Sequence, residues 1–127
     1  MNIVPLTIWR EARGEGRDGM IAVAFVIRNR ALLVNKQWPD DPERVCLQKK
    51  QFSCWNDSDP QRDLYPNETD LTYNMAQQVW DQLIVLHDPT GEATFYLNPK
   101  GVSRNPFDDP QFVKTAEIGN HWFYKKG

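Results

Sequence analysis

Glu11 is the residue of this sequence best placed for acid–base chemistry. It lies in the segment EARGE at positions 11–15, where an amphipathic helix is expected to end at the glycine. The C-terminal end of a helix carries partial negative charge, which disfavours an ionised carboxylate. Burial would raise the pKa of Glu11 further. A glutamic acid that stays protonated near neutral pH can cleave a glycosidic bond as general acid. A surface Glu–Arg pair is the alternative that this motif alone allows.

A second group of candidates mixes aromatic rings with amide and hydroxyl groups. Such surfaces suit carbohydrates, because rings stack on the apolar faces of sugars while polar groups bond the sugar hydroxyls. Each aromatic residue taken singly could equally pack in a core. Positions 51–57 lie in a long irregular region, however, and loops rarely build cores. The predicted stacking residues are Trp55 and Tyr96, and the predicted hydrogen-bonding residues are Gln51, Ser53 and Asn98.

Other catalytic chemistries fit the sequence less well. A catalytic zinc site needs about three side-chain ligands, and the two histidines, His87 and His121, have no paired spacing. We therefore expect no metal and no cofactor. A nucleophile pair of Cys46 or Cys54 with His121 lacks any neighbouring group that would lower a thiol pKa, and we expect both thiols to be free. His121 either ties the C-terminal segment to the core or helps to position the loop beside Glu11.

Composition limits the classes of protein that the chain can belong to. The 127 residues are enough for one domain, 1–127, and 40% hydrophobic residues favour a folded globule. The net charge of −2 gives no reason to expect a nucleic-acid partner. No segment approaches the ~20 apolar residues of a membrane span, and residues 1–8 do not form a secretory signal. We expect a monomer that is made in the cytoplasm.

Hydrophobic periodicity predicts a mainly helical α+β fold with two buried central helices and a short β-hairpin. The helix over 18–32 is apolar on nearly every side in its interior, which is typical of a central helix. The helix over 68–86 carries two apolar stripes and should also be largely buried. The predicted elements are helices over 5–13, 18–32, 43–48 and 68–86, a strand over 93–97, a short helix over 111–117, and a closing strand or loop over 120–124.

Six short motifs, in order, resemble the cell-wall hydrolases of the spore cortex-lytic enzyme type. They are EARGE at 11–15, AVA at 22–24 continuing to NR at 29–30, QFS at 51–53, DPTG at 88–91, YLNP at 96–99 and IGNHWF at 118–123. The resemblance implies a lysozyme-like domain related to lytic transglycosylases. It also implies cleavage of the β-1,4 bond between N-acetylmuramic acid and N-acetylglucosamine in peptidoglycan glycan strands, with Glu11 as the catalytic residue.

The chain departs from the family pattern at three places. They are Trp9-Arg10 before the first motif, Glu92 after the fourth, and the loop 54–66, which is longer and more acidic than expected. We expect these departures to bear on the peptide decoration of the substrate rather than on the reaction.

A single glutamate fits the lytic transglycosylase route, in which Glu11 serves as acid and then as base. Hydrolysis by a muramidase is the alternative, with Asp57 or Asp59 as a second carboxylate; Glu15 is expected to point elsewhere. A non-catalytic wall-binding or virion structural protein is the alternative from another class. The family's spore enzymes carry a targeting domain and an export signal, and we expect neither in this chain. We therefore expect a bacteriophage endolysin or lysin, which reaches the wall through a membrane lesion or as a virion component.

Overall fold

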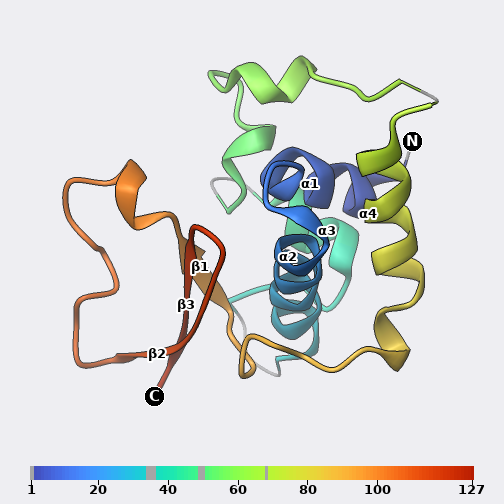
Figure 1. The fold of residues 1–127 in the computed structure, drawn as a ribbon. Helices are drawn as coiled ribbons and strands as arrows, with labels where there is room; N and C mark the ends of the chain where they lie inside the picture. The colour runs from blue at the N-terminus through green and yellow to red at the C-terminus, as the bar shows by residue number, and fades with distance from the viewer. Residues whose placement is uncertain (1, 34–36, 49–50, 68) are drawn as a thin grey trace.

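The helix α2 (Gly16–Leu32) runs through the middle of the molecule (Figure 1). In the computed structural model, which describes residues 2–33, 37–48, 51–67 and 69–127, every residue from 19 to 27 is buried. A helix that is apolar on all sides must be covered on all sides. Three further helices pack around it, namely α1 (Ile3–Ala12), α3 (Pro42–Leu47) and α4 (Leu71–Asp81). The predicted central helix is thus confirmed.

Local signals fix where the helices begin and end. The link between α1 and α2 contains Gly16 with φ of 71°, a left-handed conformation that glycine adopts at little cost. α4 begins after Asp70, whose carboxylate accepts hydrogen bonds from two backbone amides of the first turn.

The prediction of one buried helix over 68–86 is wrong. α4 ends at Asp81, and a separate 3₁₀ turn, η3 (Leu83–Val85), follows it. Ile84 and Val85 in this turn are 88% and 78% exposed, whereas Leu83 is buried. Residue 68 itself lies outside the described residues.

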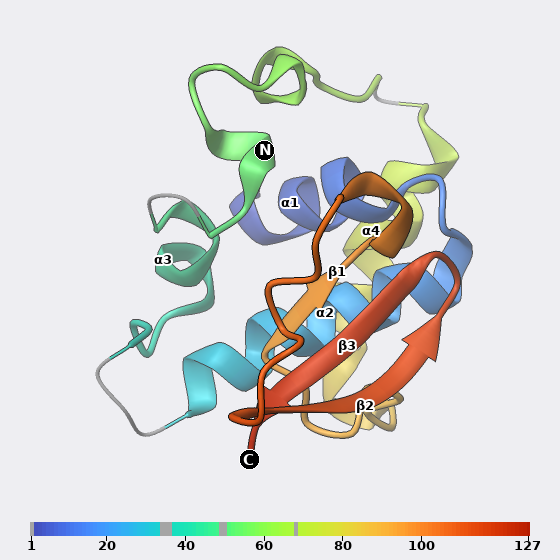
Figure 2. The same ribbon diagram turned by 90° about the vertical axis from the view of Figure 1, so that its left-hand side faces the viewer.

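The C-terminal half of the chain forms a three-stranded antiparallel sheet with strand order β1-β3-β2. The strands are β1 (Phe95–Leu97), β2 (Phe112–Ile118) and β3 (His121–Lys126). Figure 2, viewed from the sheet side, shows the strands in front of α2. The predicted short helix over 111–117 is wrong, because this segment pairs with β3 across a tight turn at Gly119, where φ is 58°.

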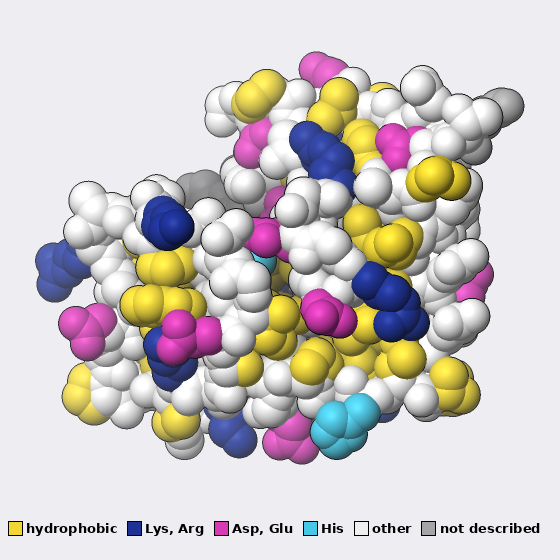
Figure 3. All heavy atoms as spheres, viewed as in Figure 1, with side chains coloured by type: hydrophobic (Ala, Val, Ile, Leu, Met, Phe, Trp, Pro, Cys, Tyr) yellow, Lys and Arg dark blue, Asp and Glu magenta, His cyan; other side chains and the backbone are white. Residues whose placement is uncertain are grey.

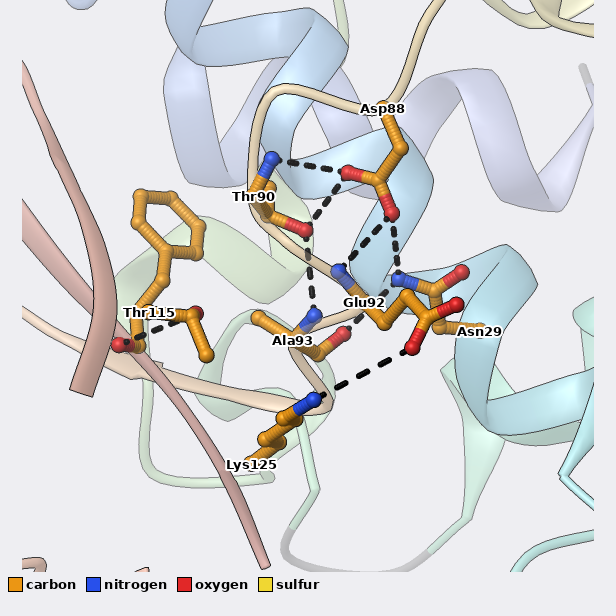
Figure 4. A network of polar contacts seen from close by, with 8 residues as sticks. Asn29, Asp88, Thr90, Glu92, Ala93, Thr115 and Lys125 are labelled. Carbon is orange, nitrogen blue, oxygen red and sulfur yellow. Dashed lines mark hydrogen bonds and ion pairs between the residues drawn. The ribbon is translucent and has the colours of Figure 1, made fainter. Parts of the chain in front are cut away.

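The turn before β1 is tied directly to α2 (Figure 4). Asp88 accepts hydrogen bonds from the backbone and hydroxyl of Thr90, and its other oxygen accepts from Asn29 Nδ2 at 3.0 Å. Asn29 also donates to the carbonyl of Ala93. Partial burial opposes ionisation of Asp88, but these hydrogen bonds hold its pKa below the usual value. The network fixes the start of β1 against the central helix.

The core lies between α2 and the elements around it. Phe25 of α2, Phe52 and Phe123 are its largest fully buried side chains. Cys46 and Cys54 are buried there as free thiols, as expected. Within the described part of the chain, no helix has the length and apolar character needed to cross a membrane.

Candidate active site

Glu11 lies in the last turn of α1, half-buried, with its carboxyl group directed towards β1. Its Oε1 accepts a hydrogen bond of 2.6 Å from the hydroxyl of Tyr96, and the thiol of Cys54 donates to the same carboxyl group. Burial raises the pKa of Glu11 above its usual value, although these hydrogen bonds and the charge of Arg30 oppose the shift. The structure therefore favours a carboxyl group that keeps its proton to higher pH than an exposed glutamate.

Tyr96 is held in place by the rings around it. It packs against Phe52, Phe123 and His121 with ring centroids 6.5, 5.6 and 5.0 Å away. Burial and the neighbouring Glu11 raise the pKa of Tyr96 well above its usual value. Its hydroxyl therefore remains a donor to Glu11 throughout the physiological pH range.

A pocket of about 390 Å³ opens at Glu11. Ligand sites commonly have volumes of ~300–1,000 Å³, so this pocket can hold a short stretch of glycan. Its walls come from the end of α1, the link to α2, the 3₁₀ turn η2 (Pro60–Asp63) and the β2–β3 turn. In the space-filling view, acidic side chains lie along the middle of this face, between the helices and the sheet (Figure 3). The lining residues are Arg10, Glu11, Arg13, Gly14, Glu15, Gln61 and Asn120.

Glu15 faces this pocket as well, so the expectation that it points elsewhere is wrong. Asn120 donates to Glu15 Oε2 at 3.3 Å, and His121 Nδ1 lies 3.9 Å from Glu15 Oε1. The turn that carries Asn120 favours glycine at position 119 because φ there is 58°, and a Cβ would also lie 3.0 Å from Glu15 Oε2. Burial lowers the pKa of His121, and Glu15 only partly offsets this effect. His121 is therefore neutral at neutral pH.

Arg30 is a buried cation in the same region that sequence reasoning missed. Its Nε donates to the carbonyl of Thr94 at 2.7 Å, and its guanidinium lies 5.0 Å from the ring centres of Trp38 and Phe52. Burial lowers the pKa of Arg30 to about 10, so it stays charged. Two signals pointed to it, namely its position near the end of an otherwise apolar helix and its place in the family match at 29–30.

Of the predicted sugar-binding residues, Tyr96 contacts Glu11, and His121 lies against Tyr96. None of the six predicted residues is among those that line the pocket at Glu11. Gln51 accepts a hydrogen bond from Trp38 Nε1 at 3.0 Å, and Asn98 accepts one from the backbone of Lys100. Their part in binding glycan stays a prediction.

Trp55 and Ser53 belong to the 3₁₀ turn η1 (Ser53–Trp55). Trp55 donates to Thr7 at 2.8 Å, and the guanidinium of Arg10 covers its ring at 4.5 Å. One face of this ring is therefore already occupied. Ser53 is exposed, and its sugar contact also stays a prediction.

The other candidate catalytic groups are the buried thiols and the carboxylates of Asp57 and Asp59, and the charge of Asp59 contributes to the raised pKa of Glu11. Burial raises the pKa of Cys46 to about 12, and burial also raises that of Cys54, so neither is an activated thiol. Asp57 is exposed and pairs with Arg62 at 3.1 Å, while Asp59 accepts from the backbone of Gln61. The described residues hold no group of three or more His, Cys, Asp or Glu side chains arranged to bind a metal.

Comparison with known proteins identifies the family. Residues 14–124 match the Cell Wall Hydrolase family over most of the chain. The chain belongs to this family. The match begins C-terminal to Glu11, so the assignment of Glu11 depends on the geometry described above and on the motif at 11–15.

Two curated relatives support the family assignment. The chain is 34% identical over 119 residues to the spore cortex-lytic enzyme of Bacillus cereus, covering 93% of this chain and 41% of that protein. It is 30% identical over 125 residues to that of Bacillus subtilis, covering 97% and 36%. It thus spans about two-fifths of the length of these relatives.

The structural comparison confirms the predicted fold class. The catalytic domain of the germination-specific lytic transglycosylase SleB from Bacillus anthracis superposes with a TM-score of 0.74 at 29% identity. The superposition covers 97% of this chain and 91% of that domain. Both share a mixed, mainly helical fold with a small sheet.

Proposed function

We propose that this cell wall hydrolase is a lytic transglycosylase that cleaves the β-1,4 bond between N-acetylmuramic acid and N-acetylglucosamine. The observation that carries the proposal is the Glu11 carboxyl group, shielded from water and held at 2.6 Å by Tyr96 at the edge of the pocket. The catalytic domain of the germination-specific lytic transglycosylase SleB, which has the same fold, supports it.

The first step is proton donation by Glu11. Its raised pKa supplies the protonated form, which gives its proton to the glycosidic oxygen as the bond to the sugar C1 breaks. The Tyr96 hydroxyl on Oε1 and the Cys54 thiol both donate to this carboxyl group and orient it for proton transfer. Tyr96 and the buried cation Arg30 then stabilise the carboxylate that forms.

The second step returns the proton to Glu11. The substrate's own acetamido group stabilises the positive charge at C1, so a second carboxylate is not required. Glu11, now a carboxylate, takes the proton from the C6 hydroxyl of the same sugar, whose oxygen bonds to C1. The product has a 1,6-anhydromuramic end, no water is consumed, and Glu11 is again protonated. This route needs no metal or cofactor.

Hydrolysis is a second candidate function, because a second carboxylate, Glu15, lines the same pocket. In a muramidase, Glu15 would hold the attacking water while Glu11 acts as acid. Its engagement with Asn120 at 3.3 Å and its approach to His121 at 3.9 Å argue for a positioning role instead.

Mass spectrometry of digested peptidoglycan distinguishes these possibilities. Anhydromuramic ends support the transglycosylase, and reducing ends support the muramidase. Unchanged glycan strands with retained wall binding would support a non-catalytic protein.

We further infer a monomeric bacteriophage lysin that reaches the wall through a membrane lesion or within a virion, with no nucleic-acid partner. The test is expression in bacteria with and without a protein that permeabilises the inner membrane. Lysis only when the membrane is permeabilised is expected for an endolysin; lysis without permeabilisation contradicts this route.

A further inference from the structure

Arg10, the residue before Glu11, is directed into a loop rather than into solvent. It is 2% exposed, and all three of its donor nitrogens face backbone carbonyls. Nη2 donates to Arg62 O at 2.8 Å, Nε donates to Leu64 O at 3.0 Å, and Nη1 lies 3.5 Å from Cys54 O. An arginine is suited to this task, because its planar guanidinium presents several donors in a fixed arrangement.

Two aromatic rings of the same loop enclose the guanidinium of Arg10. The ring of Trp55 lies 4.5 Å away and that of Tyr65 lies 4.9 Å away. Contacts of a cation with ring faces are favourable, and more so where water is excluded. We call residues 53–65 the cleft loop; in both ribbon views it lies alongside α1 (Figures 1 and 2).

The cleft loop meets the candidate active site at two points. Near its start, the Cys54 thiol donates to the Glu11 carboxyl group. Near its end, Gln61 lines the pocket and accepts a hydrogen bond from Arg13 Nη1 at 2.7 Å. Arg13 is itself fixed by the carbonyl of Arg10 at 3.1 Å and by the ring of Trp9 at 4.7 Å.

We propose that Arg10 is a positioning residue that holds the cleft loop as a fixed wall of the glycan site, with Arg13 securing the wall at Gln61. This inference rests on the proposed function, because it assigns the wall to the site at Glu11. The wall brings Gln61 to the pocket, which Asn120 of the β2–β3 turn also lines. It also keeps the Cys54 thiol within hydrogen-bonding distance of the Glu11 carboxyl group.

Removing the guanidinium has two separable consequences. The carbonyls that it satisfies lose their donor, so the cleft loop should leave α1 and exchange its amide hydrogens faster. Water should then reach Glu11, and because burial is the largest cause of its raised pKa, the pKa should fall even though the hydrogen bond from Cys54, which lowers it, is also lost. Since a general acid must be protonated, the alkaline limb of the activity profile should move to lower pH.

The test compares Arg10→Met and Arg10→Lys with the matched control Arg44→Met, which replaces an exposed arginine of α3. Hydrogen exchange followed by mass spectrometry reports on peptides covering 53–65 and on α2 as an internal reference. Release of anhydro ends from purified peptidoglycan gives kcat/KM and its pH dependence.

In Arg10→Met we expect at least ~10-fold faster exchange in the cleft loop with α2 unchanged. We also expect a ~10–100-fold loss of kcat/KM, since small misplacements of a site have effects of this size. Arg10→Lys should lie between wild type and Arg10→Met, because one ammonium cannot reach all three carbonyls. Arg44→Met should match wild type.

A folded Arg10→Met protein with wild-type loop exchange, or with wild-type kcat/KM and pH profile, would overturn the proposal. If Arg10→Met does not fold, Arg13→Met replaces it, with faster exchange at 59–63 and lower kcat/KM expected; wild-type values of both overturn the proposal. A wild-type protein that releases no glycan product contradicts the proposed function itself. If the wild type is active and the Arg10 variant keeps its loop exchange, kcat/KM and pH profile, only the positioning role is contradicted.

Discussion

The central helix α2 and the cleft loop (53–65) are held in place by opposite kinds of interaction. Residues 19–27 of α2 are wholly buried among apolar side chains, and most of their stabilisation comes from the hydrophobic effect. The cleft loop has most of its side chains in contact with solvent and is held by hydrogen bonds from Arg10 and Arg13. The hydrophobic effect is non-directional, whereas hydrogen bonds depend on distance and angle. The cleft loop is therefore positioned mainly by polar contacts, although Cys54 joins it to the core.

Glu11→Gln should separate activity from stability most sharply. An amide cannot donate the proton, so activity should fall at least ~100-fold, within the ~10²–10⁴-fold range of general acid catalysis.

The folded state raises the pKa of Glu11, so the folded protein binds this proton more tightly than the unfolded protein does. Wild-type stability should therefore fall as pH rises from the usual glutamate pKa through the raised one. The Tm of Glu11→Gln at pH 7 should equal or exceed that of wild type; near-wild-type turbidity clearance of permeabilised cells would rule out Glu11 as the acid.

Phe25→Ala should show the reverse behaviour. Phe25 is fully buried in α2, so the substitution loses a large apolar side chain and leaves a cavity. The free energy of unfolding should fall by roughly 3–5 kcal/mol, as measured by urea denaturation. The remaining folded protein should keep its specific activity at low temperature. A change within experimental error would mean that α2 is not the centre of the core.

Tyr96→Phe tests the contact between the sheet and Glu11. Only the hydroxyl is removed, so the ring still packs and the free energy of unfolding should fall by about 1 kcal/mol. The lost hydrogen bond lowers the pKa of Glu11 in the wild type, so its removal should raise that pKa. The alkaline limb of activity should move to higher pH, and kcat should fall about 10-fold because the carboxylate loses a donor. Tyr96→Ala should lower stability as well as activity, because the ring packs against Phe52 and Phe123.

Glu92→Gly should have the smallest effect, and the effect should be stabilising. Glu92 has φ of 67°, which costs a residue with a Cβ more than glycine. Its ion pair with Lys125 is long, at 4.0 Å, and its carboxylate is 84% exposed, so little is lost. Stability should rise by up to about 1 kcal/mol. Glu92→Ala is the control, since it removes the charge but keeps the strain; equal Tm changes in both variants would contradict this explanation.

The sequence predicted what local patterns determine. The apolar run of α2, the glycines after Glu11 and the turn at Asp88 each carry their own signal, and each element lies where it was expected. The strand β2 was missed because its conformation depends on pairing with β3, which its own residues do not reveal. The end of α4 was misplaced because its apolar stripe continues into the exposed turn η3.

The candidate site was predictable only in part for the same reason. A carboxylate at a helix end and an aromatic strand suggested Glu11 and Tyr96, and the fold brings them together. The sequence assigned no site role to Arg10 or Arg30, because their partners are backbone carbonyls and rings that only the tertiary structure brings to them. Gln51 does not line the pocket at Glu11, and its Oε1 accepts a hydrogen bond from Trp38, while its contact with sugar stays a prediction.

The most direct test of the account is mass spectrometry of peptidoglycan digested with the wild-type protein and with Glu11→Gln. The account predicts 1,6-anhydromuramic ends from the wild type, in amounts that grow with time, and none from Glu11→Gln at equal concentration. Reducing ends alone from the wild type, or anhydro ends from both proteins, would contradict the claim that Glu11 acts alone as acid and then base.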